Sequence, residues 1–221
     1  MKKLFIAAAF LLSSSAIFAQ TKFGIKGGVN FANQEWKSSG ISISPSSVTS
    51  FHIQGLADLP VNESISIQPG LGISGRGFKL SSDGASVTSN LVYLDLPINA
   101  VVKFPVASIG KFFIGAGPYA SYGLGGKEKS KGFNFFDDEQ TETKTDAFGK
   151  DGSYKRADFG ANFLGGVELK NGLLLNVNYG LGLLNIVKST NENEEDEFIS
   201  EEDSDVTFKN KVFSISVGFL F

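Results

Sequence analysis

Apolar and polar residues alternate along most of the chain with a period of two, the pattern of β-strands with one oily face. The segment 91–104 keeps this alternation over fourteen residues. An ordinary strand has about five or six residues, whereas this length suits a tilted strand that crosses a bilayer. In all, the pattern predicts eight strands, at 22–31, 50–60, 65–77, 91–104, 111–124, 156–170, 173–186 and 213–221.

The connections between these strands alternate in length. Short ones are predicted near 60–63, 105–110 and 170–172, and long polar ones near 32–48, 78–89, 125–155 and 188–209. Up-and-down outer-membrane barrels have short periplasmic turns and longer extracellular loops. Eight strands with both termini periplasmic need three periplasmic turns and four extracellular loops, which are the numbers of short and long connections predicted here. The pattern therefore predicts an all-β fold, an eight-stranded antiparallel up-and-down transmembrane β-barrel.

A soluble eight-stranded barrel such as a lipocalin is the structural alternative, with its apolar residues inside. The polar positions of the predicted strands carry many charges, among them Lys26, Arg76, Asp95, Lys103 and Asp158, interspersed with glycines. Paired charges and small residues suit a narrow polar lumen, so the pattern favours an inverted barrel whose apolar face meets lipid. Aromatic residues near the strand ends are expected to form girdles at the membrane surfaces: Phe31, Phe51, Phe104, Phe112, Tyr122, Tyr179, Phe213 and Phe221.

Residues 1–19 have the features of a cleaved signal peptide: Lys2 and Lys3, an apolar run, then small residues up to Ala19. Residues 20–221 would then form one outer-membrane barrel domain. Without the two leader lysines, 18 basic residues face 23 acidic ones, which gives no footprint for nucleic acid. The chain has no cysteine, which excludes disulfides and thiol chemistry. The predicted location is the bacterial outer membrane.

Several segments resemble the PorT-like outer-membrane β-barrel family, and the likeness spans the mature chain. They are KFGIKGGVNFAN, VYLDLPINAVVKF, FFIGAGPYASYGL, ADFGANFLGGVEL, LNVNYGLGLLNI and the last strand ending at Phe221. The resemblance implies an integral outer-membrane protein that the barrel-assembly machinery inserts, with the final strand as the signal for assembly. It implies no defined activity, and these residues do not separate a role in gliding-associated protein secretion from that of a generic barrel.

His52 is the single histidine, and it shares the predicted lumenal face of its strand with Ser50 and Asp58. A hydrolase would need this imidazole beside a hydroxyl nucleophile and an orienting acid or amide. Residues two apart on a strand lie almost 7 Å apart, roughly twice hydrogen-bond reach. A partner from a neighbouring strand cannot be identified from the sequence, and a lumenal polar network is the alternative.

Two predicted loops contain candidate binding residues. The run from Glu192 to Asp203 is rich in carboxylates that suit hard cations, but it lacks the spacing of an EF-hand and equally fits a solvated loop. Phe133, Phe135 and Phe136 could contact a partner, cover the barrel mouth or meet the membrane surface. The glycine-rich stretches GIKGGVN and GGVELKNG lack the lysine and hydroxyl of a phosphate-binding loop.

Three functions remain. The first is a non-enzymatic outer-membrane barrel that presents extracellular loops for interaction or supports envelope integrity; the second is a small channel or a transport or secretion accessory; the third is a hydrolase. The first predicts no catalytic, cofactor-binding or metal-binding residues, and its partners would be outer-membrane lipid, the assembly machinery and an extracellular or envelope protein. Eight strands leave an interior just wide enough for side chains, which predicts no stable channel.

Overall fold

Ten antiparallel β-strands form the secondary structure of the described part of the chain. The computed structural model describes residues 21–38, 41–43, 45–82, 85–133, 140–150, 152–188 and 206–221, so the predicted signal peptide lies outside the described residues. The strands are β1 (Lys22–Ser38), β2 (Ile41–Ile43), β3 (Val48–Pro60), β4 (Ile65–Ser82), β5 (Ala85–Val106), β6 (Gly110–Phe133), β7 (Gln140–Asp146), β8 (Ala157–Leu169), β9 (Leu173–Gly182) and β10 (Val206–Leu220).

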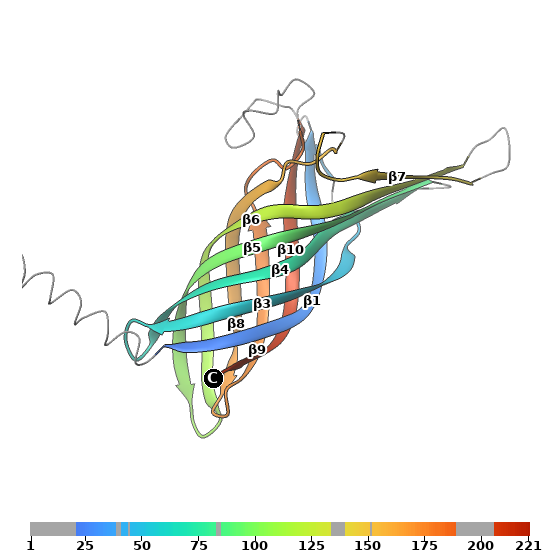
Figure 1. Cartoon of the computed structure of the whole chain (residues 1–221). Coiled ribbons are helices and arrows are strands. Elements are labelled where there is room, and N and C mark those ends of the chain that lie inside the picture. Colours follow the sequence, from blue (N-terminus) through green and yellow to red (C-terminus); the bar gives the residue numbers. More distant parts are fainter. Residues whose placement is uncertain are drawn as a thin grey trace, which may run out of the picture.

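Eight of these strands close into a ring. Hydrogen bonds join them in the order β10-β9-β8-β6-β5-β4-β3-β1, and β1 pairs with β10 from Gly24 opposite Leu220 to Ser38 opposite Val206. The short strands β2 and β7 add to β1 and β6 outside the ring. The predicted eight-stranded up-and-down barrel is therefore confirmed (Figure 1).

The three predicted short turns are present at one end of the barrel, and local chemistry accounts for two of them. The Asn62 side-chain oxygen accepts from the backbone N–H groups of Ser64 at 2.9 Å and Ile65 at 2.8 Å. Gly172 has φ +90°, a conformation that favours glycine because it has no Cβ. The Asn-Gly pair therefore makes the tight turn between β8 and β9 that its sequence predicts.

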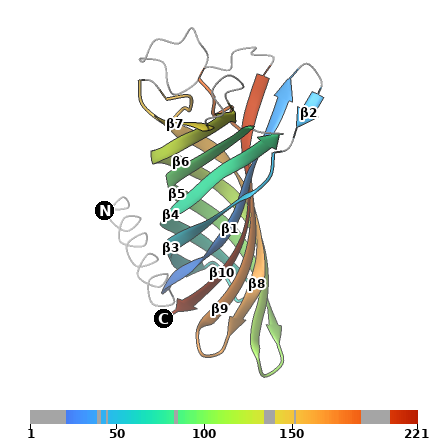
Figure 2. The ribbon, with the colours of Figure 1, turned by 90° about the vertical axis from the view of Figure 1, so that its right-hand side faces the viewer.

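All four predicted long loops are partly wrong, because strands continue into them; β10 begins at Val206, inside the loop predicted at 188–209. β1 extends to Ser38, the β4–β5 hairpin covers most of 78–89, and β6 runs on to Phe133, where β7 pairs with it. The inner side of these extensions packs in part on the apolar cluster at the loop end, through Trp36, Phe78 and Val87, and their outer side is polar, so their sequence lacks the apolar alternation that marks a membrane strand. Figure 1 shows the extended β5–β6–β7 part leaving the barrel sideways at its loop end, and Figure 2 shows β7 just above β6 there.

The outer surface of the barrel is apolar, and its interior is polar. Ile53 is 55% exposed and Phe51 72%, whereas Arg76 and Asp158 are 5% and 2% exposed. The soluble-barrel alternative, with the apolar face inside, is therefore wrong. All eight aromatic residues predicted for the girdles are exposed, and Phe31 stacks on Phe213 with ring centroids 6.3 Å apart. In the described part of the chain, no helix is long and apolar enough to cross a membrane.

Candidate functional site: the polar lumen

Ion pairs fill the lumen at the end with the short turns. The Lys103 ammonium donates to Asp58 at 2.6 Å and to Glu168 at 2.9 Å, and Lys22 donates to Glu168 at 2.7 Å. Gln68 donates to the other oxygen of Asp58 at 2.9 Å. Alternation on β3, β5 and β8 puts these groups on the inside, so the predicted pairing of opposite charges in the lumen is confirmed here.

An apolar layer follows the ion pairs. On β3 it starts at Leu56, two residues inward from Asp58, and on β5 at Val101, two residues inward from Lys103. The full cluster is Leu56, Val101, Phe113, Leu164, Leu174 and Leu220, all at most 9% exposed. Because these side chains interdigitate across a narrow barrel, they displace water from this level of the lumen.

The middle of the lumen holds a polar cavity of about 70 Å³. Its lining includes Lys26, Asn30, His52, Asn99 and Ser216, which come from four different strands. The Lys26 ammonium makes no ion pair with the described residues. A cavity of this size has room for a few water molecules and is too small for a sugar-sized solute.

His52 bridges two strands inside this cavity. Its Nδ1 lies 2.7 Å from the side-chain oxygen of Asn30, and its Nε2 lies 2.9 Å from the Ser216 hydroxyl. The Asn30 amide nitrogen donates to the carbonyl oxygen of Gly75 at 2.9 Å, which fixes the amide orientation. Asn30 therefore presents an oxygen to His52, so Nδ1 carries the proton and Nε2 is free to accept from Ser216. This is the bonding order of a Ser-His-Asn hydrolase triad.

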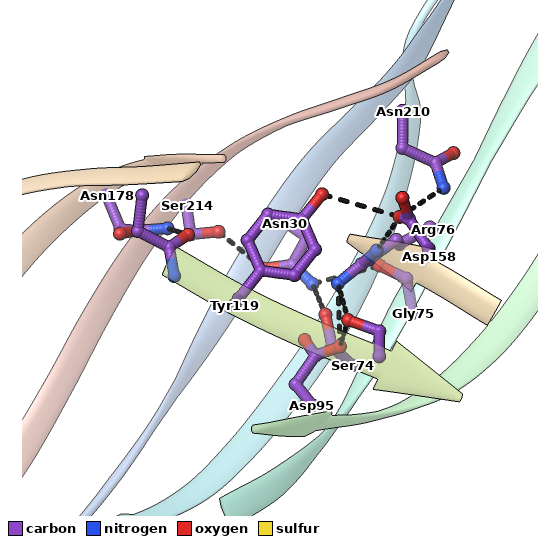
Figure 3. Close-up of polar contacts among 12 residues, drawn as sticks. Asn30, Ser74, Gly75, Arg76, Asp95, Tyr119, Asp158, Asn178, Asn210 and Ser214 are labelled. Atoms are coloured by element: carbon purple, nitrogen blue, oxygen red, sulfur yellow. Dashed lines mark hydrogen bonds and ion pairs between the residues drawn. The ribbon is translucent and has the colours of Figure 1, made fainter. Parts of the chain in front are cut away.

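Arg76 organises the next layer toward the loop end (Figure 3). Its guanidinium forms ion pairs with Asp95 at 2.6 Å and with Asp158, and it donates to the Ser121 hydroxyl at 2.9 Å. The same group lies 4.6 Å from the ring centre of Tyr93. Both carboxylates thus pair with a cation that is itself 5% exposed, so this layer is a bonded cross-brace between β4, β5 and β8.

An apolar plug closes the loop end. It consists of Phe78, Leu91, Tyr93, Ala147, Phe148, Tyr154 and Ile186. Phe148 packs edge-on against Tyr93 with ring centroids 5.5 Å apart, and the Arg156 guanidinium lies 5.5 Å from the Phe148 ring centre. Burial raises the pKa of the Tyr154 phenol, which keeps its proton and donates to Glu128 at 3.2 Å. The segment after β7 therefore folds back over the barrel mouth.

The structure places His52 as predicted but changes its partners. Ser50 donates to the Gly75 carbonyl oxygen at 2.7 Å, and Asp58 belongs to the ion-pair layer, so neither contacts His52. Sequence reasoning did not identify Ser216 and Asn30 as its partners. Both lie on predicted strands, but only the register across β10, β1 and β3 brings them to the same height.

The predicted cation and aromatic sites in the loops fall mainly outside the described residues. The acidic run 192–203 and the segment 134–139, which contains Phe135 and Phe136, are not among them. Within the described ranges, no group of three or more histidine or carboxylate side chains could hold a metal ion.

A closed antiparallel ring with an apolar exterior and a charged, hydrogen-bonded interior defines the class of transmembrane β-barrels. Residues 18–188 match the family of the outer membrane protein beta-barrel domain, so the chain belongs to this family and is a protein of the bacterial outer membrane. No curated protein matches the chain.

Two solved structures show a similar fold. Ail, the attachment invasion locus protein of Yersinia pestis, is 13% identical, with a TM-score of 0.41 over 90% of this chain and 98% of that one. Neisserial surface protein A is 14% identical, with a TM-score of 0.42 over 90% of this chain and 97% of that one. At these scores, neither similarity carries an argument about function.

Proposed function

We propose that the protein is a non-enzymatic outer-membrane barrel that presents its loop end to an extracellular or envelope partner and so supports envelope integrity. The observation that supports this most is the contrast between the two parts of the molecule. The lumen is braced by ion pairs and is packed with apolar side chains on both sides of its polar middle. The β5–β6–β7 part, in contrast, extends past the membrane-facing surface and exposes residues such as Thr143, Lys144 and Thr145.

Several narrower proposals accompany this function. Residues 1–19 are removed as a signal peptide, the barrel-assembly machinery inserts residues 20–221, and the loop end faces outward. Membership in the PorT-like branch, with a role in protein secretion, rests on the resemblance of the strand sequences. A secretion role is compatible with the layered lumen, because an accessory protein of a secretion system need not conduct ions or solutes itself.

The experiment replaces residues 127–146 with a short turn, so that the barrel keeps its ring of hydrogen bonds. The shortened chain should fold to the same heat-modifiable species as the full chain. It should nevertheless fail to restore detergent resistance to a strain that lacks the gene. Full restoration by the shortened chain would count against the proposal, and an Asn171→Ser variant at the other end serves as the control that should restore resistance.

A hydrolase is the second candidate, and the Asn30–His52–Ser216 arrangement favours it. The hydroxyl, imidazole and amide follow in the order that general-base activation of a serine requires. Against it, Ser216 is 3% exposed, and Ser214 also donates to the Asn30 oxygen at 2.8 Å. A substrate would have to pass the packed layers on either side, so we rank this function below the first.

A fluorophosphonate probe tests the hydrolase directly, because it labels an activated serine covalently. We expect no labelling of the folded chain. Labelling that is lost in both Ser216→Ala and His52→Ala, with both variants still heat-modifiable, would promote the hydrolase to the leading candidate.

A further inference from the structure

The loop-end parts of β4, β5 and β6, together with β7, form a sheet that we call the extended hairpin, and it carries exposed lysines on β4, β6 and β7. They are Lys79, Lys127, Lys129, Lys131 and Lys144. Cross-strand partners share one face of a sheet. Lys129 lies opposite Thr88 of β5 and Lys144 of β7, and Thr88 lies opposite Lys79 of β4. By alternation Lys127 and Lys131 share this face, so all five ammonium groups gather on one side, which we call the lysine face.

The strand register shows which side this is. Val92 of β5 is 39% exposed on the lipid-facing surface, and Asn90, Thr88 and Ser86 continue its parity. Lys127 lies opposite Asn90, and Lys131 lies opposite Ser86. The lysine face is therefore continuous with the lipid-facing surface of the barrel.

The opposite side of the same strands faces the barrel mouth. Leu91 and Tyr93 are buried in the apolar plug, Val87 packs against it, and Glu128 accepts from Tyr154. The parity therefore separates two environments, with the plug on one side and the lysines on the other.

The hairpin bends outward where the membrane-facing surface ends. The pairing of β5 and β6 shifts at Val92 and Tyr93, which leaves Leu124 without an opposite residue. Such a bulge bends a strand and increases its twist. Beyond it, the hairpin projects sideways from the barrel (Figure 1). Because the hairpin bends away from the barrel axis, the side that continues the lipid-facing surface turns toward the membrane. The lysine face therefore faces the membrane surface.

The height of the lysines fits the lipid headgroups. Leu124, at 47% exposed, is the exposed apolar residue of β6 that precedes the lysines, and Lys127 follows three residues later. That spacing is about 10 Å along the strand and less above the hydrocarbon, because the strand is tilted. The interfacial region is about 5–8 Å thick on each side of the bilayer, within reach of a lysine side chain.

The charge of this face contrasts with that of the chain. Five lysines stand against Glu142 and Asp146, whereas the whole chain has a formal charge of −3. Glu142 pairs with Lys131 at 3.3 Å and with Lys144 at 3.0 Å, and these bonds lower the pKa of Glu142. Lys79, Lys127 and Lys129 make no ion pair with the described residues. Three cations are thus available to an outside anion.

We propose that the lysine face binds the phosphate groups of outer-leaflet lipid beside the barrel and so holds the hairpin against the membrane surface. Phosphate suits these lysines because an ammonium group binds it as a point charge. The proposal goes beyond the role of the loop end in partner binding and rests only on the proposed outward orientation of that end. Sulfated or phosphorylated glycans free in solution are the competing occupant.

The test titrates the folded chain in neutral detergent with diphosphoryl lipid A and, separately, with phosphatidylcholine, and counts bound lipid by native mass spectrometry. We expect a preference for lipid A that weakens as salt rises. The variant K127Q/K129Q should lose about twentyfold to thirtyfold in affinity for lipid A, from the usual contribution of a basic residue near an anionic surface. K127R/K129R, which keeps the charges, should retain most of it.

The control K111Q/K170Q removes two exposed lysines at the turn end and should leave lipid A binding unchanged. Equal losses in both glutamine variants, or no preference for lipid A in the wild type, would overturn the proposal. A parallel titration with sucrose octasulfate covers the competing occupant: tight binding of this soluble anion without a preference for lipid A would assign the face to a free glycan instead. The gel shift on heating verifies that every variant is folded.

Discussion

Replacing Arg76 by methionine should destabilise the barrel strongly. Arg76 is 5% exposed and is the cation that neutralises both Asp95 and Asp158, of which Asp158 is 2% exposed. Methionine roughly keeps the length of the side chain but leaves two carboxylates without their counter-charge in a protein interior. Removing one partner of a buried ion pair costs about 3–5 kcal/mol. The rings of Tyr93 and Tyr119, at 4.6 and 5.0 Å from the guanidinium, place the expected loss toward the upper end.

The assay is urea unfolding of the chain in lipid vesicles, with the folded fraction read from the heat-modifiable band. Lys131→Gln is the control, because Lys131 pairs with Glu142 at the surface and its loss should cost about 0–1 kcal/mol. Adding Asp158→Asn to Arg76→Met should recover part of the loss, since it removes one unpaired charge. A loss for Arg76→Met as small as that for Lys131→Gln would refute the cross-brace.

Three further predictions concern topology, assembly and the plug. An impermeant thiol reagent added to intact cells should label a cysteine at Lys144 but not one at Asn171, and the reverse result would invert the orientation. Deleting residues 219–221 should lower the amount of heat-modifiable protein, because Leu220 is 3% exposed in the apolar layer; unchanged levels and gel shift would argue against this. Phe148→Ala should expose the segment after β7 to proteinase K on intact cells while the barrel itself stays folded, and equal resistance to the protease would show that the plug does not depend on this ring.

The faces of the barrel strands were predictable because alternation is a local signal. The side of β3 that carries Phe51 and Ile53 meets lipid, and the side that carries His52 and Asp58 faces inward, as the sequence alone indicates. Glycines and opposite charges on the inner side were sufficient to predict a polar lumen. Because side chains alternate along a strand, placing one residue on the lipid side determines the side of every other residue of that strand.

The partners of His52 were not predictable, because they depend on register between strands. Gly28 lies opposite both His52 of β3 and Ser216 of β10. A shift of two residues in either pairing would keep every face and break the contact. The register is determined by the turns and by packing around the whole ring. A local pattern in the sequence therefore does not predict it.

The loop end was predicted least well. Lys127, Lys129 and Lys131 alternate with Glu128 and Ser130, so this part of β6 has no apolar residue and looks like a loop in sequence. Phe148 belongs to no periodic segment, and Ile186 ends the strand predicted at 173–186 but lies beyond the end of β9 at Gly182, yet both are buried in the plug. Their burial follows from the barrel mouth that receives them, and that surface exists only after the ring has closed.

Conductance in planar bilayers tests the central claim most directly, namely that the barrel acts through its loop end and not as a pore. The folded chain is added beside a sixteen-stranded porin as the positive control. With ion pairs, an apolar layer, the Arg76 brace and the plug in series along the lumen, we predict no stable single-channel steps. Reproducible steps that disappear when Arg76 or Asp95 is substituted would contradict the account, because they would show that ions pass through this lumen.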